Sequence, residues 1–526
     1  MPEEPPVGEG GLVHTEHPEW RQWLVGALVT SGVFLAMVDT TIVDVVLPKM
    51  MPTLETDTYG IQWVVISYFM GGAVAMTFVG WLADRIGHRN AYLAGLLIFV
   101  AMSVACGEAR TLSAMVTARF VQGIGEGFLI TTGLLLLYEA FPPEQHGLAL
   151  GLYGVGGAFG PAVGPSLGGL LTEHFHWPSV FFINVPLGLL TALVLWLMVK
   201  NERSSSGGRL DVVGAALLST ALVSFVTLTA KGQEKEWLNS DFILTLVLVC
   251  GAATIGFLLW ELLAPNPLIP RTLFDGRHEF PLGLIAGTGS AVTSFGMLLV
   301  VPLYLERLRG YTALEAGLIM LPGSIAAALM LLVAGACSDR LRPKWIAITI
   351  LFLAFCTNWV FRTPLDGPRS AAVWDFFVVS LFGGTSMAPI LLLSMAPLRE
   401  HERPCGTMLV NITRLVAAST GTALAVSTLS SKQAAFYVGL ASRIDAGSTG
   451  ARTLLGALGS AAPDATGWFD TPTMHRVMAA GRTLLEAHAA SYAFYSVTKP
   501  LAVPSLAALV VLLFARNLKG QGGAIH

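Results

Sequence analysis

The sequence predicts an all-α integral membrane protein that crosses the bilayer with fourteen helices. Of its 526 residues, 54% are hydrophobic and only 12% are charged, whereas a soluble globular protein carries about 25% charged residues. Apolar stretches of about 20 residues, the length that spans the hydrocarbon core of a bilayer, occur fourteen times. No intervening stretch has the pattern of a strand-rich soluble domain.

The predicted spans begin directly after an acidic, Pro-rich start, "MPEEPPVGEG". Since the first apolar run is long enough to stay in the membrane as an anchor, we expect no cleaved signal sequence. The fourteen spans are 24–47, 61–83, 90–107, 111–137, 147–171, 179–199, 211–230, 241–263, 280–303, 313–337, 344–362, 373–397, 407–430 and 492–515.

Basic residues in the short loops predict the orientation of the chain. With the N-terminus placed inside, the inner loops contain fifteen Lys and Arg residues and the outer short loops contain eight. Cytoplasmic loops of membrane proteins carry such an excess of basic residues. We therefore expect both termini to be cytoplasmic.

Several classes of function are disfavoured by the composition. A net charge of −3 gives no basic field for nucleic acid. The five cysteines are scattered without CxxC spacing, which indicates small buried residues and neither disulfides nor a metal site. His174 and His176 could bind a metal, but an interfacial loop is the better interpretation. No GxxxxGK[ST] loop is present, so we expect no direct use of ATP. The spans contain no cluster of nucleophiles or metal ligands, so we expect no enzyme and no cofactor other than a proton gradient.

Two carboxylates interrupt the first span, in "LAMVDTTIVDVVLP". Asp39 lies well inside the apolar run, where an unpaired carboxylate costs several kcal/mol or more. It should therefore be neutralised, paired or functional. Asp44 lies about 140° further around the helix and near its outer end. We expect Asp44 to be solvated at an outer mouth, and a direct role in proton coupling is the alternative.

The fourth span contains two further charged residues. Arg119 should lie at a depth similar to that of Asp39, which predicts that both face one polar cavity. Glu126 follows Arg119 by seven residues and lies two turns deeper on the same face. A ladder of Asp39, Arg119 and Glu126 suits proton coupling, because burial, Arg119 and a cation in the cavity would each alter how readily these acids bind a proton. A static buried ion pair is the alternative.

Small residues recur every four positions in the fifth span, "GLYGVGGAFGPAVGPSLGGLL". That spacing lets another helix approach closely, and the neighbouring prolines bend the helix. No strand precedes these glycines, so they do not form a nucleotide-binding motif. The residues concerned are Gly156, Gly160, Gly164 and Gly168, with Pro161 and Pro165.

An internal repeat occurs in two loops, "GWLADRIGHR" and "GACSDRLRPK". It predicts two related six-helix halves with two inserted helices, roughly 211–263, between them. Transporters built from repeats bind their substrate at the midplane between the repeats. The matching positions are Gly80 and Gly335, Asp84 and Asp339, Arg85 and Arg340, and Arg89 and Lys344.

The predicted domain organisation follows from these spans. A loop of about 60 residues, 431–491, lies on the outer face, and a loop of that length is usually functional or disordered. Its stretch "HRVMAAGRTLLEAHAASYAFYSV" has helical spacing, and we expect it to dock a partner, with a passive lid as the alternative. The segments are a cytoplasmic tail (1–23), an N-terminal bundle (24–200), a linker with the two inserted helices (201–279), a C-terminal bundle (280–516) and a second tail (517–526).

Taken together, these stretches resemble the major facilitator superfamily, specifically its fourteen-helix drug:proton antiporters of the EmrB/QacA type. The resemblance is closest to the EmrB-like multidrug efflux permease subunits and covers nearly the whole chain. The motifs that carry it, in chain order, are "MVDTTIVDVVLP", "GWLADRIGHR", "RFVQGIGEG" with Gln122 and Gly123, "GVGGAFGPAVGPSLGG", "HWPSVFFINVPLG" with Asn184 and Pro186, and "NITRLVAASTGTALAVS" with Arg414.

The resemblance implies the major facilitator fold and export of drugs or amphipathic toxic compounds in exchange for protons. Asp39 would be the embedded acid and Arg119 the relay arginine, with Asp44 and Glu126 standing where the family usually has Asn and a small residue. The Gly160–Pro161 segment would bias the cycle toward export. It also implies that the protein is located in the inner (plasma) membrane, with a periplasmic adaptor and an outer-membrane channel as partners. Export of one metabolite, lipid or fatty acid is the alternative.

The resemblance assigns conformational gating to the two repeated loops. The gating residues would be Gly80, Asp84, Arg85, Gly87, Arg89, Asp339 and Arg340.

Overall fold

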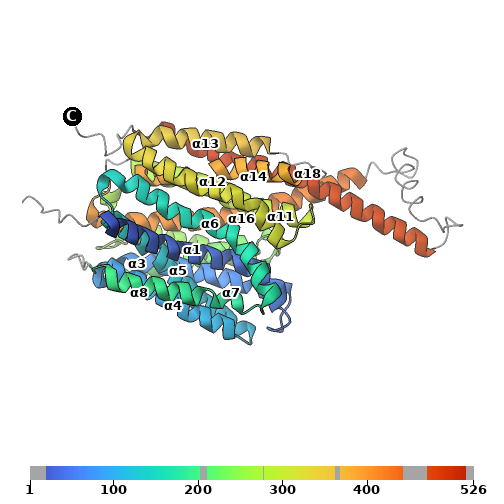
Figure 1. Cartoon of the computed structure of the whole chain (residues 1–526), viewed down its shortest axis with the longest axis horizontal. Coiled ribbons are helices and arrows are strands. Elements are labelled where there is room, and N and C mark those ends of the chain that lie inside the picture. Colours follow the sequence, from blue (N-terminus) through green and yellow to red (C-terminus); the bar gives the residue numbers. More distant parts are fainter. Residues whose placement is uncertain (1–18, 202–209, 276–277, 362–367, 442–470, 517–526) are drawn as a thin grey trace, which may run out of the picture.

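The computed structural model describes residues 19–201, 210–275, 278–361, 368–441 and 471–516. These residues form helices that lie alongside one another in one bundle (Figure 1), and no strand occurs among them. Thirteen helices are long and apolar enough to cross a membrane, and α6, taken as one span across a 40° bend, makes fourteen. The prediction of an all-α membrane protein is confirmed.

The longer helices correspond one by one to the predicted spans, although three spans are broken. Gly384, with a φ of 80° that favours glycine, separates α14 from α15. The helices are α1 (Glu19–Met50), α2 (Thr58–Ile61), α3 (Trp63–Ile86), α4 (His88–Glu108), α5 (Leu112–Ala140), α6 (His146–His174), α7 (Ser179–Phe182), α8 (Asn184–Met198), α9 (Val212–Lys231), α10 (Asp241–Leu263), α11 (Glu279–Arg307), α12 (Ala313–Arg340), α13 (Pro343–Val360), α14 (Arg369–Phe382), α15 (Met387–Met395), α16 (Arg403–Ala441) and α18 (Thr471–Leu513).

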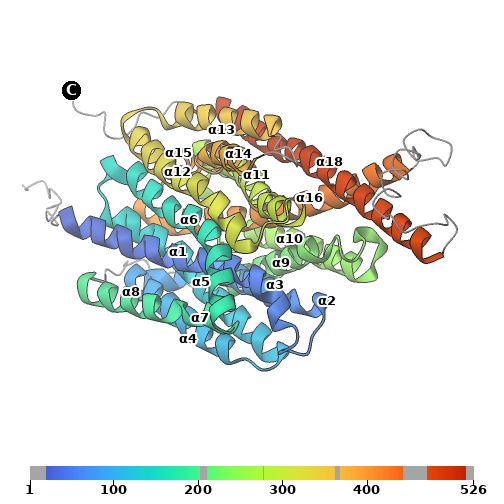
Figure 2. The same cartoon turned by 45° about the vertical axis from the view of Figure 1, so that its right-hand side comes forward.

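The helices form two groups. Helices α1 and α3–α8 pack on one another, and α11–α16 pack with α18. We call these the N-half and the C-half. Of the two inserted helices, α9 contacts α3 and α16, whereas α10 packs mainly on α9 (Figure 2). We call the end of the bundle where α3 meets α4 the inner end, which the sequence predicts to face the cytoplasm, and the opposite end the outer end.

Part of the outer loop predicted at 431–491 is helical. Helix α16 continues to Ala441 and α18 begins at Thr471, so the stretch with helical spacing is helical. At about 1.5 Å per residue, 39 residues of α16 span about 58 Å, far more than a bilayer core of about 30 Å. Both helices extend beyond the bundle (Figures 1 and 2). Segment 442–470 and the tails 1–18 and 517–526 lie outside the described residues.

Helix α6 joins the halves because it carries glycines on two faces. Toward α12, a Cβ on Gly335 would lie 2.1 Å from the carbonyl oxygen of Gly147. Toward α1, a Cβ on Gly156 would lie 2.7 Å from the carbonyl oxygen of Thr30. The glycines predicted from spacing, Gly156, Gly160, Gly164 and Gly168, all face α1. Their partner is therefore a helix of the same half, and a second glycine set contacts the C-half.

We predict that Gly335→Ala lowers the thermal stability of the purified protein. The added methyl group has no space against the α6 backbone, so the helices must separate, at a cost of about 1–3 kcal/mol. Gly251→Ala in α10 is the matched control, since nothing lies within 4 Å of its Cβ position. That change should be neutral or slightly stabilising, because Ala favours helix by about 0.5–1 kcal/mol over Gly. Equal melting temperatures for the two variants in detergent would contradict the prediction.

Candidate functional site

The Asp39 carboxylate is fully buried and accepts three hydrogen bonds from side chains. Arg119 Nη1 donates to Oδ2 at 2.5 Å. Gln122 and Asn184 donate to Oδ1 at 3.1 and 2.8 Å. Gln122 and Asn184 also bond the Ser103 hydroxyl. Donors from α5 and α8 therefore bond both oxygens of the carboxylate on α1.

The guanidinium of Arg119 is as deeply buried as its partner. Its Nε donates to the Val64 carbonyl at 3.3 Å, and its Nη1 also donates to Gln122. The face of the Tyr68 ring lies 4.1 Å from the guanidinium carbon, in a cation–π contact. A Cβ on Gly123 would lie 1.9 Å from the Tyr68 carbonyl oxygen. Glycine at this position therefore lets α3 approach α5 closely enough for Tyr68 to stack on Arg119.

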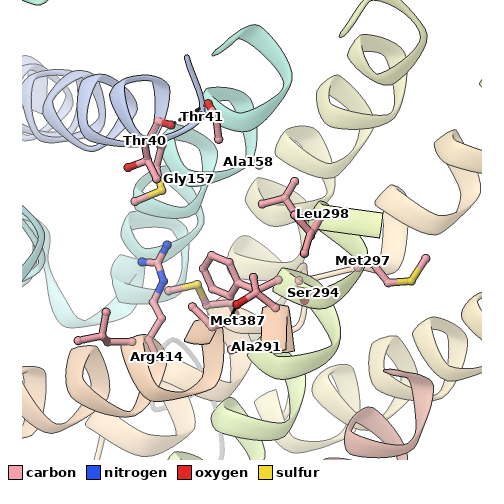
Figure 3. Close-up of a pocket in the computed structure, with 18 of the residues that line it drawn as sticks. Thr40, Thr41, Gly157, Ala158, Ala291, Ser294, Met297, Leu298, Met387 and Arg414 are labelled. Carbon is pink, nitrogen blue, oxygen red and sulfur yellow. Dashed lines mark hydrogen bonds between the residues drawn. The ribbon is translucent and has the colours of Figure 1, made fainter. Parts of the chain in front are cut away.

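A cavity of about 720 Å³ lies between the two halves (Figure 3). Helices α1, α3, α5 and α6 form one side, and α11, α12, α14, α15 and α16 form the other. The lining is mainly apolar and includes five methionines and the rings of Phe69, Phe295 and Phe376. Sites for drug-sized ligands have such volumes and linings, and flexible methionines adapt to varied shapes.

Four charged residues line this cavity. Asp44 and Glu126 belong to the N-half, and Glu306 and Arg414 belong to the C-half. Glu126 is 5% exposed, and its carboxylate is attracted electrostatically by the guanidinium groups of Arg119 and Arg414. In Figure 3 the Arg414 side chain extends from α16 toward Gly157 of α6, where a Cβ would lie 3.7 Å from its Nη2. With its acids ionised, the cavity is negative.

The structure differs from the expectation that Asp39 and Arg119 face one polar cavity. They are paired, but neither lines the cavity. Of the predicted ladder only Glu126 reaches the cavity, and Tyr68 lies on the face of the guanidinium of Arg119. Ser103 of α4 and Asn184 of α8 complete the polar network around the pair within the N-half, which their spacing in the sequence did not indicate. Asp44 is exposed and lines the cavity near its outer end, in keeping with a solvated position.

The two repeated loops make related contacts at the inner end. Asp339 Oδ1 and Oδ2 accept hydrogen bonds from the backbone N–H groups of Gly147 and Leu148, at 2.6 and 2.9 Å. A carboxylate of the C-half therefore caps the N-terminus of α6 in the N-half, where unpaired donors and the helix dipole favour a negative charge. This contact holds the halves together at the inner end.

The N-half counterpart of this contact is looser. Gly80 lies against α16, with its Cβ position 3.8 Å from the Pro404 carbonyl oxygen. Asp84 lies 3.8 Å from His88 of its own half. Arg85 and Arg340 are both exposed, and Arg85 stacks on Trp81. The repeats therefore match in position, while only the Asp339 loop shows a hydrogen-bonded cap across the halves among the described residues.

The last base of each repeat binds the end of the sixth long helix of its half. Arg89 donates to the Val199 carbonyl after α8, at 2.8 Å. Lys344 donates to the Leu513 and Ala515 carbonyls at the end of α18, at 2.9 and 2.6 Å. Cations at a helix C-terminus satisfy its free carbonyls and its dipole. The repeat in the sequence therefore corresponds to a contact that is repeated in the two halves of the structure.

The remaining predicted residues have local roles. Gly87 has a φ of 90° and ends α3, a conformation that favours glycine. Pro186 lies in the first turn of α8, where its missing N–H costs little. Pro165 lines the cavity, whereas the side chain of Pro161 lies outside the described part. His174 and His176 are exposed, and no group of three potential ligands occurs among the described residues.

Three site residues were missed from the sequence. Ser103 and Tyr68 are ordinary polar residues in apolar spans, and nothing local marks them as neighbours of Arg119. Glu306 ends the apolar run of α11 and would have passed for a loop acid. Glu306 lies three residues beyond the predicted span 280–303, so no signal in the sequence distinguished it from a loop acid.

Comparison with known proteins identifies one family, several related proteins and solved structures with the same fold. The family model for the Major Facilitator Superfamily matches residues 29–422. Multidrug export protein EmrB of Escherichia coli K12 is 28% identical, over 86% of this chain and 89% of that protein. Fatty acid resistance protein FarB of Neisseria gonorrhoeae is 29% identical, over 77% and 80%. A crystal structure of a bacterial homologue of the human lysosomal transporter Spinster has the same fold, with a TM-score of 0.53 at 16% identity, over 95% of this chain and 97% of that one.

We predict that Asp39 and Arg119 are coupled in a double-mutant cycle. Asp39→Asn or Arg119→Gln alone leaves a buried charge without its partner, a change that costs about 3–5 kcal/mol. The double variant should therefore lose less stability than the sum of the singles, by about 0.5–3 kcal/mol. Thermal melting of the purified protein measures this. Strictly additive losses would show that the two side chains act independently.

Proposed function

Because this chain belongs to the Major Facilitator Superfamily, we propose that it is a proton-coupled efflux transporter that exports amphipathic toxic compounds by alternating access. Relatives of this chain include multidrug export protein EmrB and the probable multidrug resistance protein EmrY, which favours an efflux transporter over an enzyme. The observation that carries the proposal is the large apolar cavity with three carboxylates, bounded by both halves. Apolar walls suit lipophilic compounds, and a negative cavity favours cations.

The proposed coupling uses two separate acids. A cation that enters the cavity stabilises the ionised form of Glu126 and favours release of its proton. Asp39 lies outside the cavity, so it exchanges a proton only when its bond to Arg119 opens during the conformational change. Arg119 remains charged and acts by approaching or leaving Asp39. Each export step would therefore be linked to the rearrangement that exposes Asp39.

The inner end supplies the gate in this proposal. Asp339 on the N-terminus of α6 holds the inner end together in the present conformation. Substrate from the cytoplasm or the inner leaflet requires that contact to break. The Asp84 loop, which lacks such a cap among the described residues, would form or release its own contact with α16 in the same cycle.

A tripartite assembly is the proposed setting. Helices α16 and α18 extend past the outer end of the bundle, where the Phe436 and Tyr492 rings pack at 5.6 Å. If this end faces the periplasm of an inner-membrane protein, the extension offers a rigid surface to a periplasmic adaptor, which in turn would meet an outer-membrane channel.

We predict that Asp39→Asn abolishes proton release that depends on a lipophilic cation. Proteoliposomes that contain a pH dye measure the release when ethidium or tetraphenylphosphonium is added. Asp241→Asn, at the exposed start of α10, is the control and should behave as wild type. Normal proton release in Asp39→Asn would place coupling at another residue. If the wild type releases no protons with any compound, multidrug antiport by the isolated protein is refuted.

The same preparation separates binding from coupling. We predict that Glu126→Gln raises the KM for lipophilic cations about tenfold, the equivalent of about 1.4 kcal/mol of lost attraction. Neutral lipophilic compounds should keep their KM, because the apolar walls are unchanged. An equal loss for cations and neutral compounds would mean that Glu126 supports the cavity structurally and does not attract charge.

Export of a fatty acid is the second candidate function. Arg414 provides one cation in the cavity, and one relative is a fatty acid resistance protein. Three carboxylates in the same cavity disfavour an anion. Competition decides between the two: oleate should not inhibit cation-dependent release if the leading proposal holds, whereas strong inhibition that Arg414→Gln removes would favour the fatty acid.

A further inference from the structure

Helix α9 belongs to the segment that separates the two halves in the sequence, yet in the structure it reaches the central cavity. Val226, Thr229 and Ala230 line that cavity together with residues of both halves. Their spacing of three and four places them on one face of the helix. This face lies in the outer half of α9, toward its end at Lys231.

The position of α9 explains how it reaches the cavity. On one side of the bundle the two halves meet directly, through the close contact of α6 with α12. On the other side α3 and α16 meet less extensively, and α9 packs against both (Figure 2). Leu222 and Val226 of α9 form one apolar cluster with Ala73 and Met76 of α3 and with Ile412 of α16. Helix α9 therefore fills the seam between the halves.

Hydrogen bonds from two residues of α9, Ser219 and Lys231, hold the helix on the N-half. The hydroxyls of Ser219 and Thr77 are 2.9 Å apart. At the outer end Lys231, which is 3% exposed, donates to Gln62 Oε1 at 2.8 Å and to the Tyr59 carbonyl at 3.1 Å. Its third partner is Glu234 Oε2, at 2.6 Å. Toward α16 the contact is made by the apolar cluster. Hydrogen bonds fix a position, whereas apolar surfaces tolerate sliding.

We propose that α9 is a wall of the substrate-binding site, held on α3, and that Thr229 and Ala230 help to select the compounds that bind. That the bound compound is a substrate rests on the proposed export function. That α9 forms a wall of the site rests on the cavity alone. The ligand class is the amphipathic compounds that the apolar cavity accepts. A bulkier residue at Thr229 reduces the space for large compounds and leaves small ones unaffected.

Thr220 offers a matched control on the same helix. Both threonines donate their hydroxyl to a carbonyl of the preceding turn, Thr220 to Ala216 at 2.8 Å and Thr229 to Phe225 at 2.9 Å. Thr220 is exposed and does not line the cavity. Nine residues separate the two, which places them about 180° apart around the helix. A substitution at either position therefore removes the same kind of hydrogen bond to the preceding turn. Only the substitution at Thr229 also alters the lining of the cavity.

The first experiment needs no transport activity. Thr229→Cys and Thr220→Cys are labelled with a membrane-impermeant maleimide in membranes, with labelling of the parent protein subtracted. We expect at least tenfold faster labelling at 229, because it opens to an aqueous cavity while 220 faces lipid. Equal rates, or a faster rate at 220, would overturn the placement of α9 as a wall.

The second experiment tests selection. Thr229→Trp should lower proton release about tenfold for a large cation such as Hoechst 33342 and leave tetramethylammonium-sized or other small cations near the wild-type rate. Thr220→Trp should leave the ratio of the two rates unchanged. An unchanged ratio in Thr229→Trp, with a wild type that transports, would refute the selective role. A wild type that transports nothing would refute the export function, while the labelling result still decides the wall.

Discussion

The ion pair between Asp39 and Arg119 is the constraint on which the N-half depends. Both side chains are excluded from water and from the cavity, so each relies on the other and on the polar groups around them. Charges removed from water cost several kcal/mol each unless geometry and hydrogen bonds compensate. Here helices α1, α3, α4, α5 and α8 each contribute a contact to the pair or to its partners. The packing of these helices is thereby fixed around one polar centre.

The separation of this pair from the cavity shapes the mechanism. A compound in the cavity cannot touch Asp39, so it can act on Asp39 only through its charge or through the side chains packed between them. Tyr68 is the nearest connection, since its ring covers Arg119 and its buried hydroxyl lies beside Thr40 and Glu126, two residues that line the cavity. Packed interiors shift between discrete arrangements rather than deform smoothly. The proposed coupling therefore requires a rearrangement around Tyr68 between the cavity and the buried acid.

Much of the fold could be predicted from the sequence because a bilayer imposes a simple rule. Spanning segments must be helical and apolar, so composition and length identify them. The charged residues of the site were also detectable, since Asp39, Arg119 and Glu126 stand out in apolar runs. Their neighbours were not, because Ser103 and Tyr68 are unremarkable within their own spans. Which face of a helix meets the cavity depends on three-dimensional packing, and for that reason Asp39 was assigned to the cavity and α9 was not.

The basic residues at the ends of the repeats bear on how the protein assembles. Arg89 bonds the end of α8, and both belong to the first part of the chain, so the N-half can complete this contact early in synthesis. Lys344 is 6% exposed and bonds the carbonyls of Leu513 and Ala515, which follow it by about 170 residues. Until that distant helix end reaches the ribosome exit and inserts, the ammonium group of Lys344 has no such acceptor. The C-half therefore acquires this contact only after α18 has been made, and a chain that stops before Leu513 would leave the Lys344 ammonium group without either carbonyl acceptor.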